Sequence, residues 1–125
     1  MRLLSALTVL LLLLGCNRRP NLVGQWQSGL GGALTHYTFE KDGTFTIDVL
    51  SMGYHCVSKG RYHVEGGRLF LDPSDATVEG AGPDRDAIRN QLLQQSRLTM
   101  KVISPMSIQL GLQEPPLVIN RMGPP

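Results

Sequence analysis

Histidine and cysteine side chains are the first candidates for chemistry, because they are the usual ligands of transition metals. The chain contains His36, His55 and His63, and Cys56 directly follows His55. In an extended strand His55 and His63 share one face, whereas Cys56 lies on the opposite face. Because no His-x-His or Cys-x-x-Cys pair is present, the spacing offers no ready set of ligands, and we expect no metal site.

The sequence motifs of hydrolases and nucleotide-binding proteins are also missing. There is no G-x-S-x-G turn and no H-E-x-x-H helix, and the glycine-rich residues 29–32 are not followed by Lys-Ser/Thr. No pair of carboxylates is placed for acid–base catalysis, so we expect a protein that is not an enzyme and needs no cofactor. With 12 Lys and Arg residues against 10 Asp and Glu residues, the charge balance does not favour binding to nucleic acid.

The aromatic residues point instead to binding or packing. All seven lie between Trp26 and Phe70, and the last 55 residues contain none. A ligand-binding barrel often lines its mouth with aromatic rings, so Tyr37, Tyr54 and Phe70 are candidate contacts for a small apolar ligand. Core packing of the first five strands would produce the same distribution, and it is the favoured interpretation.

A series of short strands would position these residues. From Leu22 onward apolar and polar residues alternate, and glycine-rich turns separate the alternating segments. Asp42-Gly43 predicts a tight hairpin turn, and Gly60 predicts a bend or bulge in the long fourth strand. The predicted strands cover residues 22–27, 33–40, 44–50, 54–64, 68–72, 97–104, 106–112 and 117–122.

The alternation stops at Pro73, and residues 73–83 are predicted to form a loop. Residues 84–95 contain no glycine or proline, and Ile88 and Leu92 form an apolar stripe, which predicts one short amphipathic helix. The expected fold class is therefore all-β. It would be a small antiparallel up-and-down barrel or strongly curved sheet of about eight strands, with one inserted helix.

The first fifteen residues have the pattern of a secretory signal peptide. Arg2 supplies a positive charge, and an apolar run follows that is shorter than the roughly 20 residues of a membrane-spanning helix. The run ends in Leu13-Leu14-Gly15-Cys16, which resembles the lipobox of bacterial lipoproteins. The resemblance implies cleavage before Cys16, a thioether link from its sulfur to diacylglycerol, and acylation of the new amino terminus. The alternative is an ordinary signal peptide with an unrelated cysteine.

This resemblance also implies a location and a division of the chain. Inner-membrane lipoproteins of Gram-negative bacteria often carry aspartate after the lipidated cysteine, whereas this chain carries Asn17, which favours the outer membrane of the cell envelope. Residues 1–15 would be the signal peptide, 16–21 the lipidated cysteine and a short tether, 22–122 the β domain, and 123–125 a frayed end. With Cys16 modified, Cys56 has no disulfide partner, and we expect it to be buried as a small apolar side chain.

The order of motifs in the β domain resembles the small lipocalin-like (calycin-type) barrels of bacteria. Gly24-Gln25-Trp26 has the form of the lipocalin G-x-W signature, and the glycine-turn hairpins at residues 39–45 and 60–69 follow in the matching order. In lipocalins an arginine of the last strand packs across this tryptophan. The resemblance therefore implies a barrel-closing contact between Trp26 and Arg121, whereas a solvated Arg121 is the alternative.

Two interpretations of function stay open for such a lipid-anchored envelope protein. The barrel would bind a small hydrophobic ligand, or it would be filled by its own side chains and serve as a structural or protein-interaction module. A cavity of several hundred Å³ opening between residues 29–32 and 52–55 would favour the first, and a filled interior the second. Strands of about six to eight residues enclose little more than their own side chains, which argues against a large cavity.

Overall fold

The computed structural model describes residues 21–30, 33–51, 53–80, 82–111 and 117–123. The predicted signal peptide at residues 1–15 and the predicted lipid attachment at Cys16 lie outside these ranges. None of the described helices is long and apolar enough to cross a membrane. The elements are β1 (Gly24–Leu30), β2 (Ala33–Phe39), β3 (Thr44–Ser51), β4 (Tyr54–Glu65), β5 (Arg68–Glu79), α2 (Arg85–Leu92), β6 (Ser96–Ser104), β7 (Ser107–Leu110) and β8 (Leu117–Arg121).

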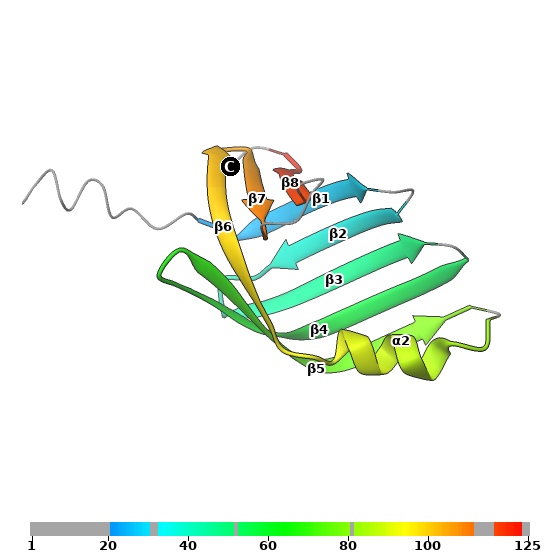
Figure 1. Cartoon of the computed structure of the whole chain (residues 1–125). Helices are drawn as coiled ribbons and strands as arrows, with labels where there is room; N and C mark the ends of the chain where they lie inside the picture. Colours follow the sequence, from blue (N-terminus) through cyan, green and yellow to red (C-terminus); the bar gives the residue numbers. More distant parts are fainter. Residues whose placement is uncertain (1–20, 31–32, 52, 81, 112–116, 124–125) are drawn as a thin grey trace, which may run out of the picture.

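The eight strands form one closed antiparallel barrel in which each strand pairs with its neighbours in the sequence (Figure 1). The barrel closes where β1 meets β8, with Trp26 opposite Arg121. The pairing is uneven around the barrel. β4 and β5 pair along almost their whole length, whereas β5 and β6 pair only from Arg68 to Leu71 on the β5 side. The architecture confirms the predicted all-β barrel with one short helix.

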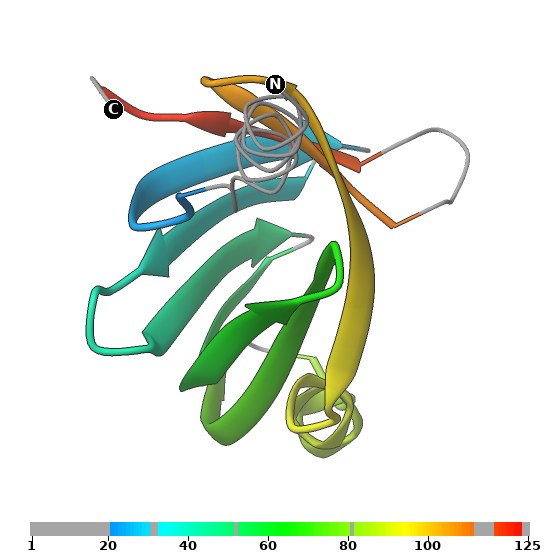
Figure 2. The same ribbon diagram turned by 90° about the vertical axis from the view of Figure 1, so that its left-hand side faces the viewer.

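The short pairing between β5 and β6 gives the barrel two unlike halves. In one half all eight strands surround the interior, whereas the long strands β3 to β5 extend beyond β6 to β8 into the other half (Figures 1 and 2). α2 runs beside the part of β5 that β6 leaves unpaired. The Arg89 side chain on α2 donates a hydrogen bond from Nε to the carbonyl oxygen of Ala76 on β5, at 2.9 Å. The helix thus covers the part of the wall that lacks a strand partner.

The prediction of a loop at residues 73–83 is wrong for most of its length. β5 continues through Pro73 to Glu79 and stays paired with β4. The register shifts where Gly60 pairs with Pro73 and Lys59 with Asp75, so Ser74 is the extra residue of a bulge. This bulge accommodates a proline, which has no N–H to donate to the ladder. The irregularity predicted at Gly60 is confirmed, and it is what lets the strand continue.

The core lies in the half that all eight strands enclose. The alternation predicted from the sequence holds there, because Leu69 and Leu71 are buried on either side of the partly exposed Phe70, and Tyr37 is also buried. Cys56 is also buried, as predicted, and its burial raises the pKa of the thiol. The largest side chains with almost no exposed surface are Trp26, Phe39, Phe45, Leu69, Ile108, Leu110 and Ile119.

The contact expected between Trp26 and Arg121 is present at this end of the barrel. The guanidinium carbon of Arg121 lies 4.2 Å from the centre of the Trp26 ring. The indole N–H donates to the carbonyl oxygen of Leu22 at 2.9 Å. Arg121 also donates from its two terminal nitrogens to the carbonyl oxygens of Val23 and Asn21, at 2.9 and 2.6 Å. Arg121 therefore caps the tryptophan and fixes the chain that leads into β1.

Candidate functional site

A cavity of about 300 Å³ lies between α2 and the inner face of the barrel. Phe45 and Ile47 on β3 line one side, and Ile88 and Leu92 line the helical side. Its volume is at the lower end of the roughly 300–1,000 Å³ that ligand pockets occupy. The remaining lining residues are Ser58, Leu71, Pro73, Gln91, Gln94 and Ser96. An apolar cavity with a few polar groups suits a small ligand that has an apolar body and a polar end.

Small side chains on the barrel wall explain why this half keeps free space. Ser58 on β4 pairs with Ala76 on β5, and both are buried although neither carries a large side chain. In the other half, Trp26 and Phe39 fill the corresponding space with aromatic rings. Because α2 covers the wall at Ala76 without inserting a buried side chain of its own, the interior beneath it is only partly filled.

The helix that covers the cavity is held by few interactions. None of its residues is buried, and its N-cap residue, Asp84, makes no capping hydrogen bond with its side chain. Ile88 and Leu92, four residues apart, are half-buried and face the cavity. Elements with little buried apolar contact are those that open most readily in folded proteins. Among the elements that line the cavity, α2 is therefore the one expected to open most readily.

The three aromatic residues predicted to contact a ligand do not come together. Tyr37 is buried in the core, with its ring centre 6.4 Å from that of Phe39, and burial raises the pKa of its hydroxyl. Tyr54 lies at the start of β4, beside a separate surface hollow. Phe70 faces outward, because Leu69 and Leu71 on either side of it face the core. None of the three lines the cavity under α2, so this cavity does not bring the candidate aromatic contacts together.

A wider groove of about 800 Å³ crosses the outer face of β4, β5 and the start of β6. At its centre His63 stacks on Phe70, with ring centres 4.5 Å apart, and the guanidinium carbon of Arg97 lies 5.0 Å from the same ring. Asp72 accepts a hydrogen bond from the Gln95 amide at 3.1 Å. The lining of this groove is more polar than that of the cavity beside α2, so the groove makes a weaker case for an apolar ligand.

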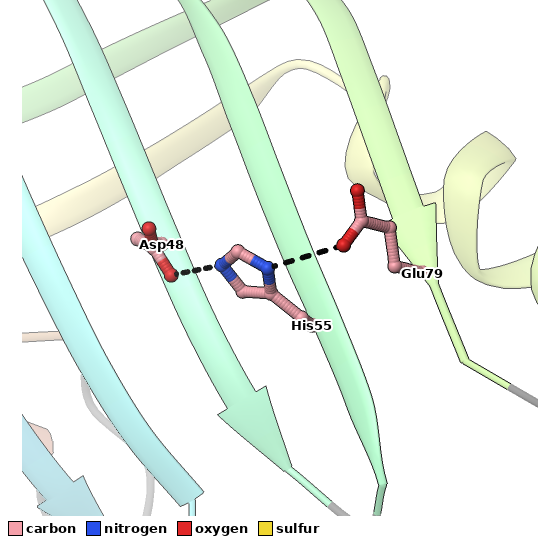
Figure 3. A network of polar contacts seen from close by, with 3 residues as sticks. All are labelled: Asp48, His55 and Glu79. Carbon is pink, nitrogen blue, oxygen red and sulfur yellow. Dashed lines mark hydrogen bonds and ion pairs between the residues drawn. The ribbon is translucent and has the colours of Figure 1, made fainter.

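A second polar cluster lies on the outer face of β3, β4 and β5, where His55 stands between two carboxylates (Figure 3). His55 Nε2 lies 2.8 Å from Asp48 Oδ1, and His55 Nδ1 lies 3.7 Å from Glu79 Oε2. The hydrogen bond to Asp48 is the main cause that raises the pKa of His55. Within the described ranges no group of three His, Cys, Asp or Glu side chains is arranged to hold a metal ion. The cluster is a surface ion-pair network that strengthens when the histidine is protonated.

The Asp48 contact predicts a measurable pH dependence. Since the folded state raises the pKa of His55, the stabilisation is fully present below the usual histidine pKa of about 6.5 and is lost as pH rises through the raised value. In Asp48→Asn we expect the pKa of His55, measured by NMR titration, to fall toward about 6.5. Asp75→Asn is the control, because it removes a carboxylate that pairs opposite Lys59 and not opposite His55. This variant should leave the pKa of His55 unchanged. Equal pKa values of His55 in the two variants would contradict this interpretation.

Sequence reasoning identified one wall of the cavity but not the site itself. The apolar stripe of Ile88 and Leu92 was apparent from spacing, but the surface that it covers depends on where β6 stops pairing with β5. No protein-family model matches this chain, and no curated protein matches it. Function must therefore be inferred from the cavity and from the sequence of the amino-terminal segment.

Proposed function

We propose that the protein is a lipid-anchored lipoprotein of the bacterial cell envelope whose lipocalin-like barrel binds a small apolar ligand beneath α2. The observation that carries this proposal is the cavity of about 300 Å³, with apolar side chains of β3 and α2 facing each other across it. Ser58, Gln91 and Gln94 add polar groups that would orient the polar end of a ligand. Binding, rather than catalysis, is the activity that this lining supports.

The amino-terminal sequence supports the anchor. Leu13-Leu14-Gly15-Cys16 follows an apolar run, and Asn17 stands where retention in the inner membrane often requires aspartate in this class of lipoprotein. Acyl chains on Cys16, each methylene contributing about 0.8 kcal/mol when buried, would hold the protein stably at the membrane. The outer membrane is the proposed location.

The alternative is a structural or protein-interaction module of the envelope with a filled barrel. The half around Trp26 favours this alternative, because Phe39, Leu110 and other large side chains fill it. The half under α2 favours a ligand, because small residues such as Ser58 and Ala76 form its wall. The two functions therefore differ in one measurable property, which is whether the space under α2 takes up a small molecule.

A substitution that fills the cavity separates these functions. Ile88→Trp places an indole where the helix faces β3, whereas Asn90→Trp adds the same group to an exposed position of α2 that does not line the cavity. We expect octanoate, an eight-carbon fatty acid, to bind the wild type and Asn90→Trp with similar affinity. We expect its affinity for Ile88→Trp to be at least about tenfold lower, a loss of about 1.4 kcal/mol.

The measurement is an NMR titration of the methyl groups that line the cavity, with octanoate as the ligand. Thermal unfolding of the three proteins checks that both tryptophan variants are folded at the titration temperature. Equal affinities in all three proteins would contradict the assignment of the cavity. No saturable shift in the wild type would contradict ligand binding and favour the filled interaction module.

A further inference from the structure

Exposed apolar side chains gather at the end of the barrel opposite α2. Six large apolar side chains are exposed in the part of the chain that the structure describes, and four of them form what we call the apolar tip: Val102, Ile103, Met106 and Met122. Val102 and Ile103 are consecutive in β6, yet they are 51% and 54% exposed. A regular strand would turn one of them inward. Val102 still pairs with Ile108, and the register between β6 and β7 shifts only beyond it, between Val102 and Ser104, where Ile103 is the unpaired residue. Both side chains lie near the end of β6 and remain in solvent.

The apolar tip is connected to the point where the chain enters the barrel. The backbone N–H of Arg121 donates to the carbonyl oxygen of Met106 at 2.7 Å. The side chain of the same arginine donates to the carbonyl oxygen of Asn21 at 2.6 Å. Arg121 thus joins the β6–β7 turn, the end of β8 and the first described residue. Figures 1 and 2 both show the β6–β7 hairpin beside the start of the described chain.

The predicted lipid attachment site lies within a short reach of this tip. Cys16 precedes Asn21 by five residues, and an extended chain spans at most about 3.6 Å per residue. A lipid on Cys16 would therefore enter the membrane no more than about 18 Å from Asn21. Arg18 and Arg19 in the same segment, and Lys101 next to the tip, carry positive charge that anionic headgroups would attract.

We propose that the apolar tip docks on the lipid surface that holds the acyl chains of Cys16. Val102, Ile103 and Met106 would enter the boundary between headgroups and acyl chains, and Lys101 would contact anionic headgroups. This second attachment gives the barrel one orientation on the membrane, with α2 on the side away from the lipid (Figure 1). The cavity lined by α2 would then also lie away from the lipid. The inference rests on the proposed anchor at Cys16 but not on the proposed ligand.

The remaining pair of exposed apolar side chains provides a matched control. Leu34 and Leu50 pair across β2 and β3, and Leu50 is 52% exposed, almost as much as Val102. β3 ends at the side of the barrel away from the β6–β7 hairpin (Figure 1). A probe at position 50 therefore replaces a similarly exposed apolar side chain that lies far from the tether.

The test measures the depth of each position in a membrane. Two variants of the mature protein, made from the full chain, each carry one new cysteine, Met106→Cys or Leu50→Cys. The new cysteine is labelled with a nitrobenzoxadiazole fluorophore. The labelled protein is then reconstituted into vesicles of phosphatidylethanolamine and phosphatidylglycerol that contain nitroxide-labelled phospholipid as the quencher. The protein without a new cysteine is the labelling blank, because the free cysteine in its described residues, Cys56, is buried. We expect quenching by the nitroxide lipid to be at least about threefold greater at position 106 than at position 50.

Two readouts separate failure of the tip from failure of the anchor. Mass spectrometry of the amino-terminal peptide reports whether Cys16 carries lipid. A lipidated protein with equal quenching at both positions would overturn docking of the tip and leave the anchor standing. An unmodified Cys16 would overturn the anchor and the docking together. A label at position 106 that is shielded from water but not quenched by nitroxide lipid would assign the tip to a protein partner or a second copy, and would also overturn the proposal.

Discussion

Trp26→Ala is expected to lower the free energy of unfolding by about 3–5 kcal/mol, the usual cost of truncating a fully buried large aromatic side chain. Trp26 has no exposed surface, and it fills the closed end of the barrel where β1 meets β8. Its indole N–H also satisfies the carbonyl oxygen of Leu22, and its ring supports the guanidinium of Arg121. Removing the ring therefore creates a cavity and disrupts the contacts that close the barrel.

A double-mutant cycle with Arg121→Ala separates packing from the contact between the two side chains. Unfolding in urea, followed by circular dichroism, gives the free energy of unfolding for the wild type, each single variant and the double variant. We expect a coupling energy of about 0.5–2 kcal/mol, because the guanidinium lies over the ring. Strictly additive effects would contradict a barrel-closing role for the pair, and an unchanged stability of Trp26→Ala would contradict the core assignment.

Gly60→Ala is expected to lower the free energy of unfolding by about 1–3 kcal/mol, the typical cost of overpacking a well-packed site. A methyl group at Gly60 would lie 2.6 Å from the Cα atom of Pro73 and even closer to the carbonyl oxygen of Asp72. Both neighbours are backbone atoms of β5 in the bulge. The clash with the added methyl group can therefore be relieved only if β4 and β5 move apart. The effect is steric, because it comes from the close approach of two backbones.

Gly29→Ala is the matched control for this prediction. Gly29 also lies within a strand, β1, but a methyl group built on it meets no atom within 4 Å. We expect its free energy of unfolding to stay within about 0.5 kcal/mol of the wild type. Urea unfolding of the two variants makes the comparison. Equal destabilisation by both substitutions would show that the bulge at Gly60 is not sterically demanding and would contradict the register of β4 and β5.

The sequence predicts the strands best where large apolar residues alternate with polar ones. Phe45 on β3 and the pair Leu69 and Leu71 on β5 have this pattern, and all three are buried. The second half of β5 escaped detection because its inward-facing Ala76 is small and Pro73 suggests a chain break. Hydrogen bonding to β4 and the bulge at Gly60 override these local signals, and both depend on a neighbouring strand.

The candidate site was less predictable than the fold, because it depends on contacts between distant elements. The cavity exists where β6 leaves β5 after a few paired residues and α2 covers the gap, and no local pattern specifies the end of that pairing. Phe70, a candidate ligand contact, lies between the inward-facing Leu69 and Leu71 and therefore lines the outer groove and not the cavity. The contact between Trp26 and Arg121 was accessible only through resemblance, since nearly the whole barrel separates them in sequence.

Native mass spectrometry of the mature protein extracted from its own envelope tests most directly whether the barrel carries a ligand under α2. We predict that a fraction of the wild-type molecules retains one small apolar molecule in addition to the acyl groups on Cys16. The same molecule should remain on Asn90→Trp and be lost from Ile88→Trp, whose indole occupies the cavity. A mass equal to the polypeptide and its acyl groups alone, in all three proteins, would contradict the proposed binding function.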